Sequence, residues 1–174
     1  FEINPKQFSW IVTSYALAAF ISGLLSALFI DRFDRKQALF WLYIGFTFGT
    51  LACSFAESYR LFLAARMLTG AFGGVLGALV LSIVGDAIPL VRRGRAMGII
   101  MTAFSVASVV GVPAGLYLAA QFKWNTPFLV VGLLSAVFCI AIFLLMPSMT
   151  KHIHQGKDRP KIFQAYLYIL GDNN

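Results

Sequence analysis

Residues 96–122 read AMGIIMTAFSVASVVGVPAGLYLAAQF and contain no Asp, Glu, Lys or Arg. An α-helix needs about 20 mostly apolar residues to cross the hydrocarbon core of a bilayer. Four more charge-free windows of similar length occupy residues 7–30, 37–56, 67–85 and 124–150, and none alternates like a barrel strand. The sequence therefore predicts an all-α membrane protein with five transmembrane helices, at about 8–30, 38–55, 61–84, 96–121 and 127–146.

The composition points to the same class. Of the 174 residues, 59% are hydrophobic and 12% are charged, whereas soluble domains are about 45–50% apolar and about 25% charged. So few polar residues cannot cover a soluble globule, and disorder requires low hydrophobicity. The two cysteines, Cys53 and Cys139, lie inside apolar runs, which argues against a disulfide scaffold.

The Lys and Arg residues predict how the helices are oriented. Ten of them lie in the 31–36 loop, the 91–95 loop and the tail after residue 150, and three lie in the segments on the opposite side. Because Lys and Arg accumulate on the cytoplasmic side, we place residue 174 in the cytoplasm and residue 1 outside. An even number of helices would bring both termini inside, so we expect one more helix before residue 1. The separation of the basic residues among several loops argues against a nucleic-acid partner.

Three acidic residues on this side, Asp31, Asp34 and Asp86, need separate interpretations. Asp31 follows a predicted helix, and the helix dipole disfavours an anion there, so we expect it to have a cationic or helix-N-terminal partner. The 31–36 loop is so short that we expect a left-handed backbone at Asp34. Asp86 lies on the same side as Arg35 and could pair with it or be an ordinary surface residue.

Arg66 lies within the predicted span 61–84, where insertion of an Arg costs about 2.5–3.5 kcal/mol. Its side chain could extend to the outer interface, or it could be a buried cation that faces a polar cavity. Gly70 and Gly74 follow on the same helical face, and small residues at this spacing allow another helix to approach closely. An Arg on a packed face points into the bundle, which favours the functional interpretation.

The span 96–121 contains a second pair of glycines, Gly111 and Gly115, with Pro113 between them. A proline inside a helix removes a hydrogen bond and kinks the helix, so this segment could pack tightly, form a bend that shapes a gate, or do both. The chain contains no H-E-x-x-H, G-x-S-x-G or Walker motif. We therefore predict no enzymatic reaction, no cofactor and no metal site.

Several of these stretches resemble motifs of the major facilitator superfamily. Residues 27–36, ALFIDRFDRK, are similar to its G-x-x-x-D-R-x-G-R-[RK] motif, with Ala27 and Asp34 in place of the two glycines. Residues 66–74 resemble the R-x-x-x-G motif of its helix 4, and residues 86–96 resemble D-x-x-P-x-x-x-R-G-R-A. Residues 111–115 look like a variant of the helix 5 motif associated with antiporters. The closest resemblance is to the drug and sugar efflux group, which includes arabinose-efflux-like permeases.

The resemblance implies a domain organisation. Residues 1–147 would be helices 2–6 of a twelve-helix fold, which is the N-terminal six-helix half without helix 1. Residues 148–174 would begin the cytoplasmic linker to the C-terminal six-helix half. The partners would be these missing segments, the lipid bilayer, protons and a small-molecule solute.

The resemblance also implies roles for individual residues. Arg66 would take part in proton coupling, Asp86 is a possible ion-pair partner, and the glycines and proline named above would bend and pack the helices. The residues of the expected cytoplasmic gating motif are Asp31, Arg32, Asp34, Arg35 and Lys36.

The function implied is secondary active transport by alternating access, in the form of proton-coupled efflux of a sugar or drug-like solute. The expected location is the plasma membrane, as a multi-pass protein of the bacterial inner membrane. Two alternatives stay open. One is a proton-coupled uptake symporter of the same superfamily, and the other is a non-transporting polytopic membrane scaffold subunit.

Overall fold

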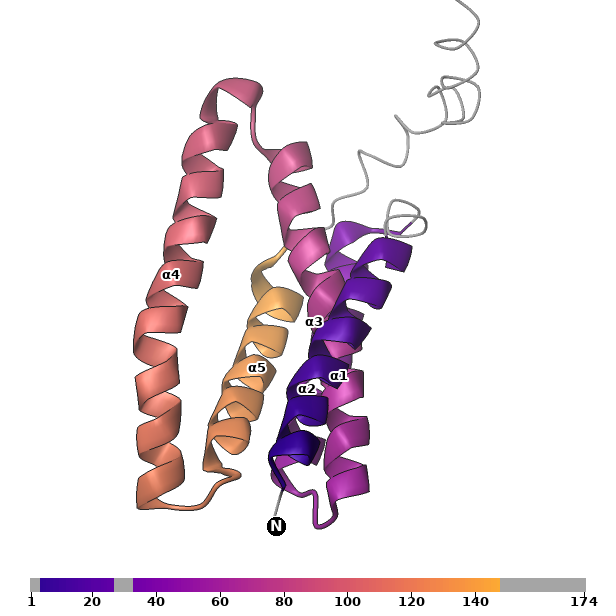
Figure 1. Ribbon diagram of the computed structural model, residues 1–174. Helices are drawn as coiled ribbons and strands as arrows, with labels where there is room; N and C mark the ends of the chain where they lie inside the picture. Colours follow the sequence, from indigo (N-terminus) through magenta and orange to yellow (C-terminus); the bar gives the residue numbers. More distant parts are fainter. Residues whose placement is uncertain (1–3, 27–32, 148–174) are drawn as a thin grey trace, which may run out of the picture.

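The computed structural model describes residues 4–26 and 33–147, and within these ranges it consists of five α-helices and short loops (Figure 1). The helices are α1 (Pro5–Ser26), α2 (Arg35–Ser54), α3 (Tyr59–Ala87), α4 (Leu90–Gln121) and α5 (Thr126–Leu145). Each is long and apolar enough to cross a membrane. The prediction of an all-α membrane protein with five transmembrane helices is therefore confirmed.

The helix ends reflect local capping and charge. The backbone N–H of Asn4 donates to Oε1 of Gln7 at 3.1 Å, which satisfies one free polar group where α1 begins. α4 begins directly after Pro89, earlier than its apolar window, and its first turns carry Arg92 and Arg93. Its 32 residues extend for about 48 Å, compared with about 30 Å for a hydrocarbon core. The charge-free window therefore marked only the part of α4 that matches the hydrocarbon.

The backbone at Asp34 shows that one prediction was wrong. Asp34 has φ −58° and ψ 127° and is the N-cap of α2, and no described residue, glycines included, has a positive φ. Its carboxylate accepts a hydrogen bond from the backbone N–H of Lys36 at 3.1 Å. An extended N-cap satisfies one of the free N–H groups at the helix start, so Asp34 starts a helix instead of forming a left-handed turn.

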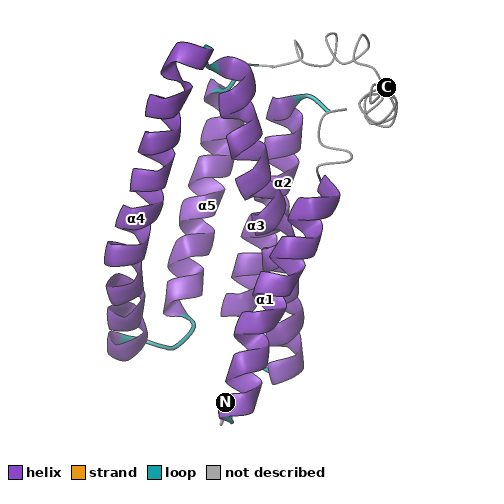
Figure 2. Ribbon diagram, turned by 45° about the horizontal axis from the view of Figure 1, so that its top comes forward, coloured by secondary structure: helices purple, strands orange, loops and turns teal. Residues whose placement is uncertain are grey.

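Four of the helices form one packed group. α1 packs on α3, α3 on α2, and α2 on α5 (Figures 1 and 2). Two small clusters of buried side chains hold them together, one around Cys53 and Phe62 and the other around Leu39 and Leu79. α4 is the outermost helix in Figure 2 and contains no buried residue within the described part of the chain.

Candidate functional site

The close contact between α1 and α3 is built on two glycines. A Cβ atom at Gly70 would collide with the carbonyl oxygen of Tyr15, and one at Gly74 would collide with that of Ala19. The backbone of α1 can therefore lie directly against α3 only because these positions lack side chains. This contact brings Tyr15 next to Arg66, which lies one turn before Gly70 on α3.

Arg66 is held between aromatic rings from two other helices. Its guanidinium carbon lies 4.5 Å from the ring centroid of Tyr15 on α1 and 5.6 Å from that of Phe128 on α5. Both distances are within the range of cation–π attraction. The structure thus directs the side chain toward the neighbouring helices instead of along α3 to the outer interface.

The guanidinium of Arg66 is incompletely satisfied. Its Nε atom is buried and has no hydrogen-bond acceptor, and no carboxylate within the described ranges forms a salt bridge with it. A buried donor without an acceptor is unfavourable by about 1–3 kcal/mol, and more when it carries charge. The site is therefore arranged to receive an anionic or hydrogen-bond-accepting group.

An aromatic cluster fixes the ring of Phe128 beside Arg66. The ring of Phe62 on α3 meets the rings of Trp124 and Phe128 nearly edge to face, each at a centroid distance of 5.4 Å. The side-chain amide of Asn125 also donates to the carbonyl oxygen of Ser54 at 2.6 Å, which ties the α4–α5 loop to the end of α2. These contacts position the start of α5 against α2 and α3.

Arg35 and Asp86 form an ion pair at the other end of the group. The Nε and Nη2 atoms of Arg35 donate to Oδ2 of Asp86 at 3.1 and 2.8 Å. Arg35 is 2% exposed, whereas the side chain of Asp86 is 36% exposed. The pair connects the first residue of α2 to the last turn of α3, and the cation offsets the unfavourable position of a carboxylate at a helix C-terminus. Of the two possibilities left open for Asp86, the structure shows the ion pair.

Of the remaining residues of the expected gating motif, the structure describes Asp34 and Lys36. Asp34 caps α2 as described above, and the ammonium of Lys36 lies 5.8 Å from the ring centroid of Phe143 on α5. Asp31 and Arg32 lie outside the described residues, as do residues 148–174 of the expected linker.

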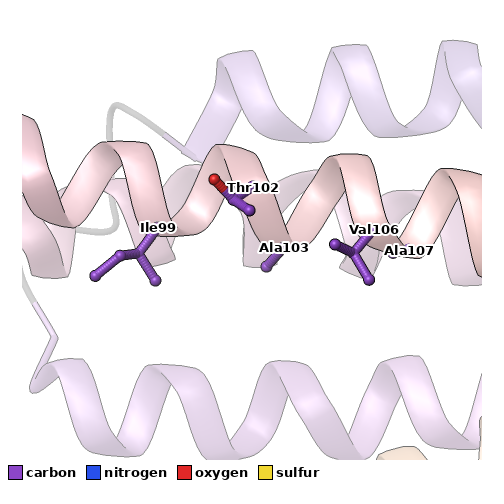
Figure 3. A pocket seen from close by; sticks show the side chains of 5 residues that line it. All are labelled: Ile99, Thr102, Ala103, Val106 and Ala107. Atoms are coloured by element: carbon purple, nitrogen blue, oxygen red, sulfur yellow. The ribbon is translucent and has the colours of Figure 1, made fainter.

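The expected packing residues of α4 have no close neighbour. A Cβ atom at Gly111 or Gly115 would meet nothing within 4 Å, and α4 continues as a single helix through Pro113. A shallow hollow of about 530 Å³ lies on the same helix, and Figure 3 shows that its wall comes from α4 alone. Its lining residues are Ile99, Thr102, Ala103, Val106 and Ala107. Any tight packing of this face must therefore involve a group beyond the described residues.

Sequence reasoning did not identify the partners of Arg66. Spacing along one helix shows which residues share a face with Arg66, but Tyr15 and Phe128 come from other helices. The same limitation applies to the bond between Asn125 and Ser54. Within the described part of the chain, no group of three or more His, Cys, Asp or Glu residues could hold a metal ion.

Comparison with known proteins identifies relatives along the whole chain. The family model described as Major Facilitator Superfamily matches residues 1–173. The chain is 33% identical over 150 residues to the vacuolar membrane amino acid uptake transporter fnx2 of Schizosaccharomyces pombe, covering 86% of the chain and 26% of that protein. It is 30% identical over 178 residues to the MFS-type transporter YceJ of Bacillus subtilis, and this match covers 98% of the chain and 43% of that protein.

A third relative is a probable sugar efflux transporter of Mannheimia succiniciproducens, which is 25% identical over 181 residues. That match covers 98% of the chain and 45% of the relative. The chain therefore spans less than half the length of each of these three relatives.

Proposed function

Because the chain belongs to the major facilitator superfamily, we propose that it forms part of a proton-coupled secondary transporter that exports a small organic solute. The chain is a multi-pass membrane protein with five membrane-spanning helices. The members of this family are transporters, which confirms the prediction that the chain is not an enzyme. The observation that carries the proposal is the partly buried cation of Arg66, whose buried Nε atom has no hydrogen-bond acceptor.

Arg66 would act as a fixed positive charge. A guanidinium keeps its proton at any physiological pH, so Arg66 does not itself carry the transported proton. A nearby cation favours the ionised form of a carboxyl group and lowers its pKa. We propose that a carboxyl group outside the described residues approaches Arg66 in one access state and releases its proton there.

The ion pair between Arg35 and Asp86 would make the cytoplasmic corner of this half rigid. Secondary transporters alternate access by rocking one helical repeat against the other, and such a motion requires stiff elements. In this proposal Asp31, Arg32, Asp34, Arg35 and Lys36 form the cytoplasmic gating motif. Asp31 would contact a helix N-terminus of the C-terminal half, where the helix dipole favours an anion.

The charge distribution supports the proposed orientation. Five basic residues of the described ranges lie at the end where α2 and α4 begin: Arg35, Lys36, Arg92, Arg93 and Arg95. Three basic residues, Lys6, Arg60 and Lys123, lie at the opposite end. We propose that the first end is cytoplasmic, that the membrane is the plasma membrane of a bacterium, and that α1–α5 correspond to helices 2–6 of the twelve-helix fold.

Export is favoured over uptake by residues 111–115, which resemble the helix 5 motif of antiporters, and by the relative named as a probable sugar efflux transporter. Proton-coupled uptake is the second candidate, because another relative is named as an amino acid uptake transporter. We propose that Gly111, Pro113 and Gly115 bend and pack α4 against a helix of the second half.

The test is counterflow of radiolabelled sugars and amino acids in proteoliposomes that hold the full-length protein, with and without a pH gradient. We expect gradient-driven transport to be largely lost in Arg66→Ala, because an intramembrane charge of this kind marks a functional site, while Arg66→Lys retains part of it. Met67→Ala is the control, because Met67 is the exposed neighbour of Arg66 on α3. If the transport rate does not depend on the pH gradient and Arg66→Ala transports as fast as the wild type, the proposal that Arg66 couples transport to protons is wrong.

A second variant tests the gate. Asp31→Asn should cut transport while leaving expression intact, because the loss of its charge unbalances the two access states. Normal turnover in this variant would show that the gating assignment is wrong.

A further inference from the structure

An apolar groove runs between α2 and α5 on the surface of the group. It has a volume of about 540 Å³, and its wall includes the side chains of Phe40, Ile44 and Phe48 from α2 and of Ile140 and Phe143 from α5. Phe48, Ile140 and Phe143 are each more than half exposed. The groove therefore opens to the surroundings of the helices.

The wall of the groove leaves no hydrogen-bonding side chain unsatisfied. The hydroxyl of Thr47 is part of the lining, and it lies 2.7 Å from the hydroxyl of Ser135 on α5. Since this hydroxyl is already paired, an apolar occupant would not leave it without a partner. The groove suits a hydrocarbon chain along its whole length.

One end of the groove carries a positive charge. Lys36 lies one turn before Phe40 on α2, and its ammonium is 5.8 Å from the ring centroid of Phe143 in the groove wall. The charge of Arg35 is paired with Asp86, whereas Lys36 forms no salt bridge among the described residues. An ammonium at the mouth of an apolar groove matches a molecule with an anionic head and a hydrocarbon tail.

The length of the groove fits the tail of a lipid. The groove extends along α2 from Phe40 to Leu51, which is about 16 Å at the helical rise of about 1.5 Å per residue. This is about half of a hydrocarbon core of about 30 Å. A chain that starts at Lys36 and follows the groove would therefore occupy the depth of a single leaflet.

The residues at the rim favour lipid over another helix. Phe40, Phe48 and Phe143 are large aromatic side chains, whereas helix–helix contacts in membranes are enriched in small residues. The exposed face of α4 offers such small residues at Ala107 and Gly111. The chain thus presents one face suited to a protein neighbour and a different one suited to an acyl chain.

We propose that the groove between α2 and α5 binds one acyl chain of an anionic phospholipid, whose phosphate group contacts the ammonium of Lys36. Anionic lipids are concentrated in the cytoplasmic leaflet, which is the leaflet of Lys36 in the orientation proposed above. The contact attracts the headgroup by its charge, and the groove holds the chain by burying its methylene groups.

Native mass spectrometry of the full-length protein tests the proposal. The delipidated protein is mixed with equal amounts of phosphatidylglycerol and phosphatidylcholine that have the same acyl chains, and the bound lipid is counted. We expect the wild type to retain phosphatidylglycerol preferentially. Ile140→Trp fills the groove and should reduce retention of both lipids about tenfold. Lys36→Gln should lower the preference for phosphatidylglycerol about fivefold without emptying the groove.

The matched control is Leu134→Trp. Leu134 is exposed on α5 to a similar extent as Ile140 but does not line the groove, so its variant should bind lipid like the wild type. Ile44→Trp fills the groove from α2 and replaces Ile140→Trp if that variant does not fold. Wild-type retention of phosphatidylglycerol in a folded groove-filling variant would overturn the proposal. Equal binding of both lipids by the wild type would also contradict the proposal. So would a wild-type dimer that dissociates when the groove is filled, because the groove would then bind a second copy of the protein instead of a lipid.

Discussion

The contact between α1 and α3 and the open face of α4 carry the same sequence signal and use it differently. α3 has Gly70 and Gly74, and α4 has Gly111 and Gly115, each pair with a spacing of four residues. A Cβ atom at either glycine of α3 would collide with the backbone of α1, whereas one at either glycine of α4 would meet nothing. The spacing therefore shows that a helix can be approached closely, but it does not show which neighbour approaches.

The physical reason lies in the solvent. Lipid tails are as apolar as leucine side chains, so membrane helices associate through van der Waals fit and polar contacts and not through hydrophobic burial. Phe104 and Val109 of α4 are more than two thirds exposed, yet exposure of this kind has no large cost in a bilayer. Apolar exposure alone therefore does not show whether a helix face contacts lipid or another protein segment. A glycine pair that lies against the backbone of a neighbouring helix does show a protein contact.

The largest expected effect comes from breaking the α1–α3 contact. Gly74→Ala should lower the free energy of unfolding by about 3 kcal/mol, because the new methyl group meets the backbone carbonyl of Ala19, which cannot move without moving α1. Gly77→Ala is the control on the same helix, since its methyl group would meet open space. Thermal unfolding of the two variants in detergent measures the difference. Equal melting temperatures would mean that α1 and α3 are not in direct contact.

A smaller effect is expected at the ion pair that joins α2 to α3 in the packed group. Asp86→Asn should lower the free energy of unfolding by about 2 kcal/mol, because it removes the charge of the group that accepts two hydrogen bonds from the buried guanidinium of Arg35. The partial exposure of Asp86 allows water to compensate in part. Glu57→Gln is the control at an exposed carboxylate, and chemical unfolding in detergent compares the two. If both variants unfold alike, the pair does not stabilise the packed group.

Thr47→Val sharpens the comparison at the contact between α2 and α5. It removes the bond between the hydroxyls of Thr47 and Ser135, and bonds of this kind between membrane helices contribute about 0.6 kcal/mol on average. Thr13→Val on the exposed side of α1 should have no such effect. A loss much greater than that average in Thr47→Val would assign the α2–α5 contact to polar bonding instead of packing.

The smallest effect on stability is expected on α4. In the five-helix chain alone, Gly111→Leu should leave the free energy of unfolding unchanged or raise it by up to about 1 kcal/mol, because no described residue lies near the new side chain and leucine favours a helix. The proposed packing against the second half predicts that transport by the full-length protein nevertheless falls, because leucine does not fit a helix contact built on small residues; counterflow measures this loss. Unchanged transport would show that this face of α4 does not pack against a helix of the second half. A large loss of stability in the five-helix chain would contradict the open environment of Gly111.

Much of the fold followed from the sequence, and less of the site. The charge-free windows predict the five helices because a bilayer requires a contiguous apolar segment of nearly constant length. The exact starts of α2 and α4 did not follow, since the cap at Asp34 and the charged first turns of α4 lie beyond the apolar core. Arg66 could be identified as unusual, but the two rings beside it come from helices far away in the chain.

By itself the sequence determined the number of membrane-spanning helices, the separation of basic residues between the two ends and the two glycine faces. These properties depend on the transfer of each contiguous segment, and of each charge, into the membrane, which acts locally along the chain. Only the tertiary structure decided that Gly70 and Gly74 meet α1, that Arg35 pairs with Asp86 and that Arg66 lies between Tyr15 and Phe128. Such pairings depend on the fit between distant helices of similar composition, and no local pattern encodes that fit.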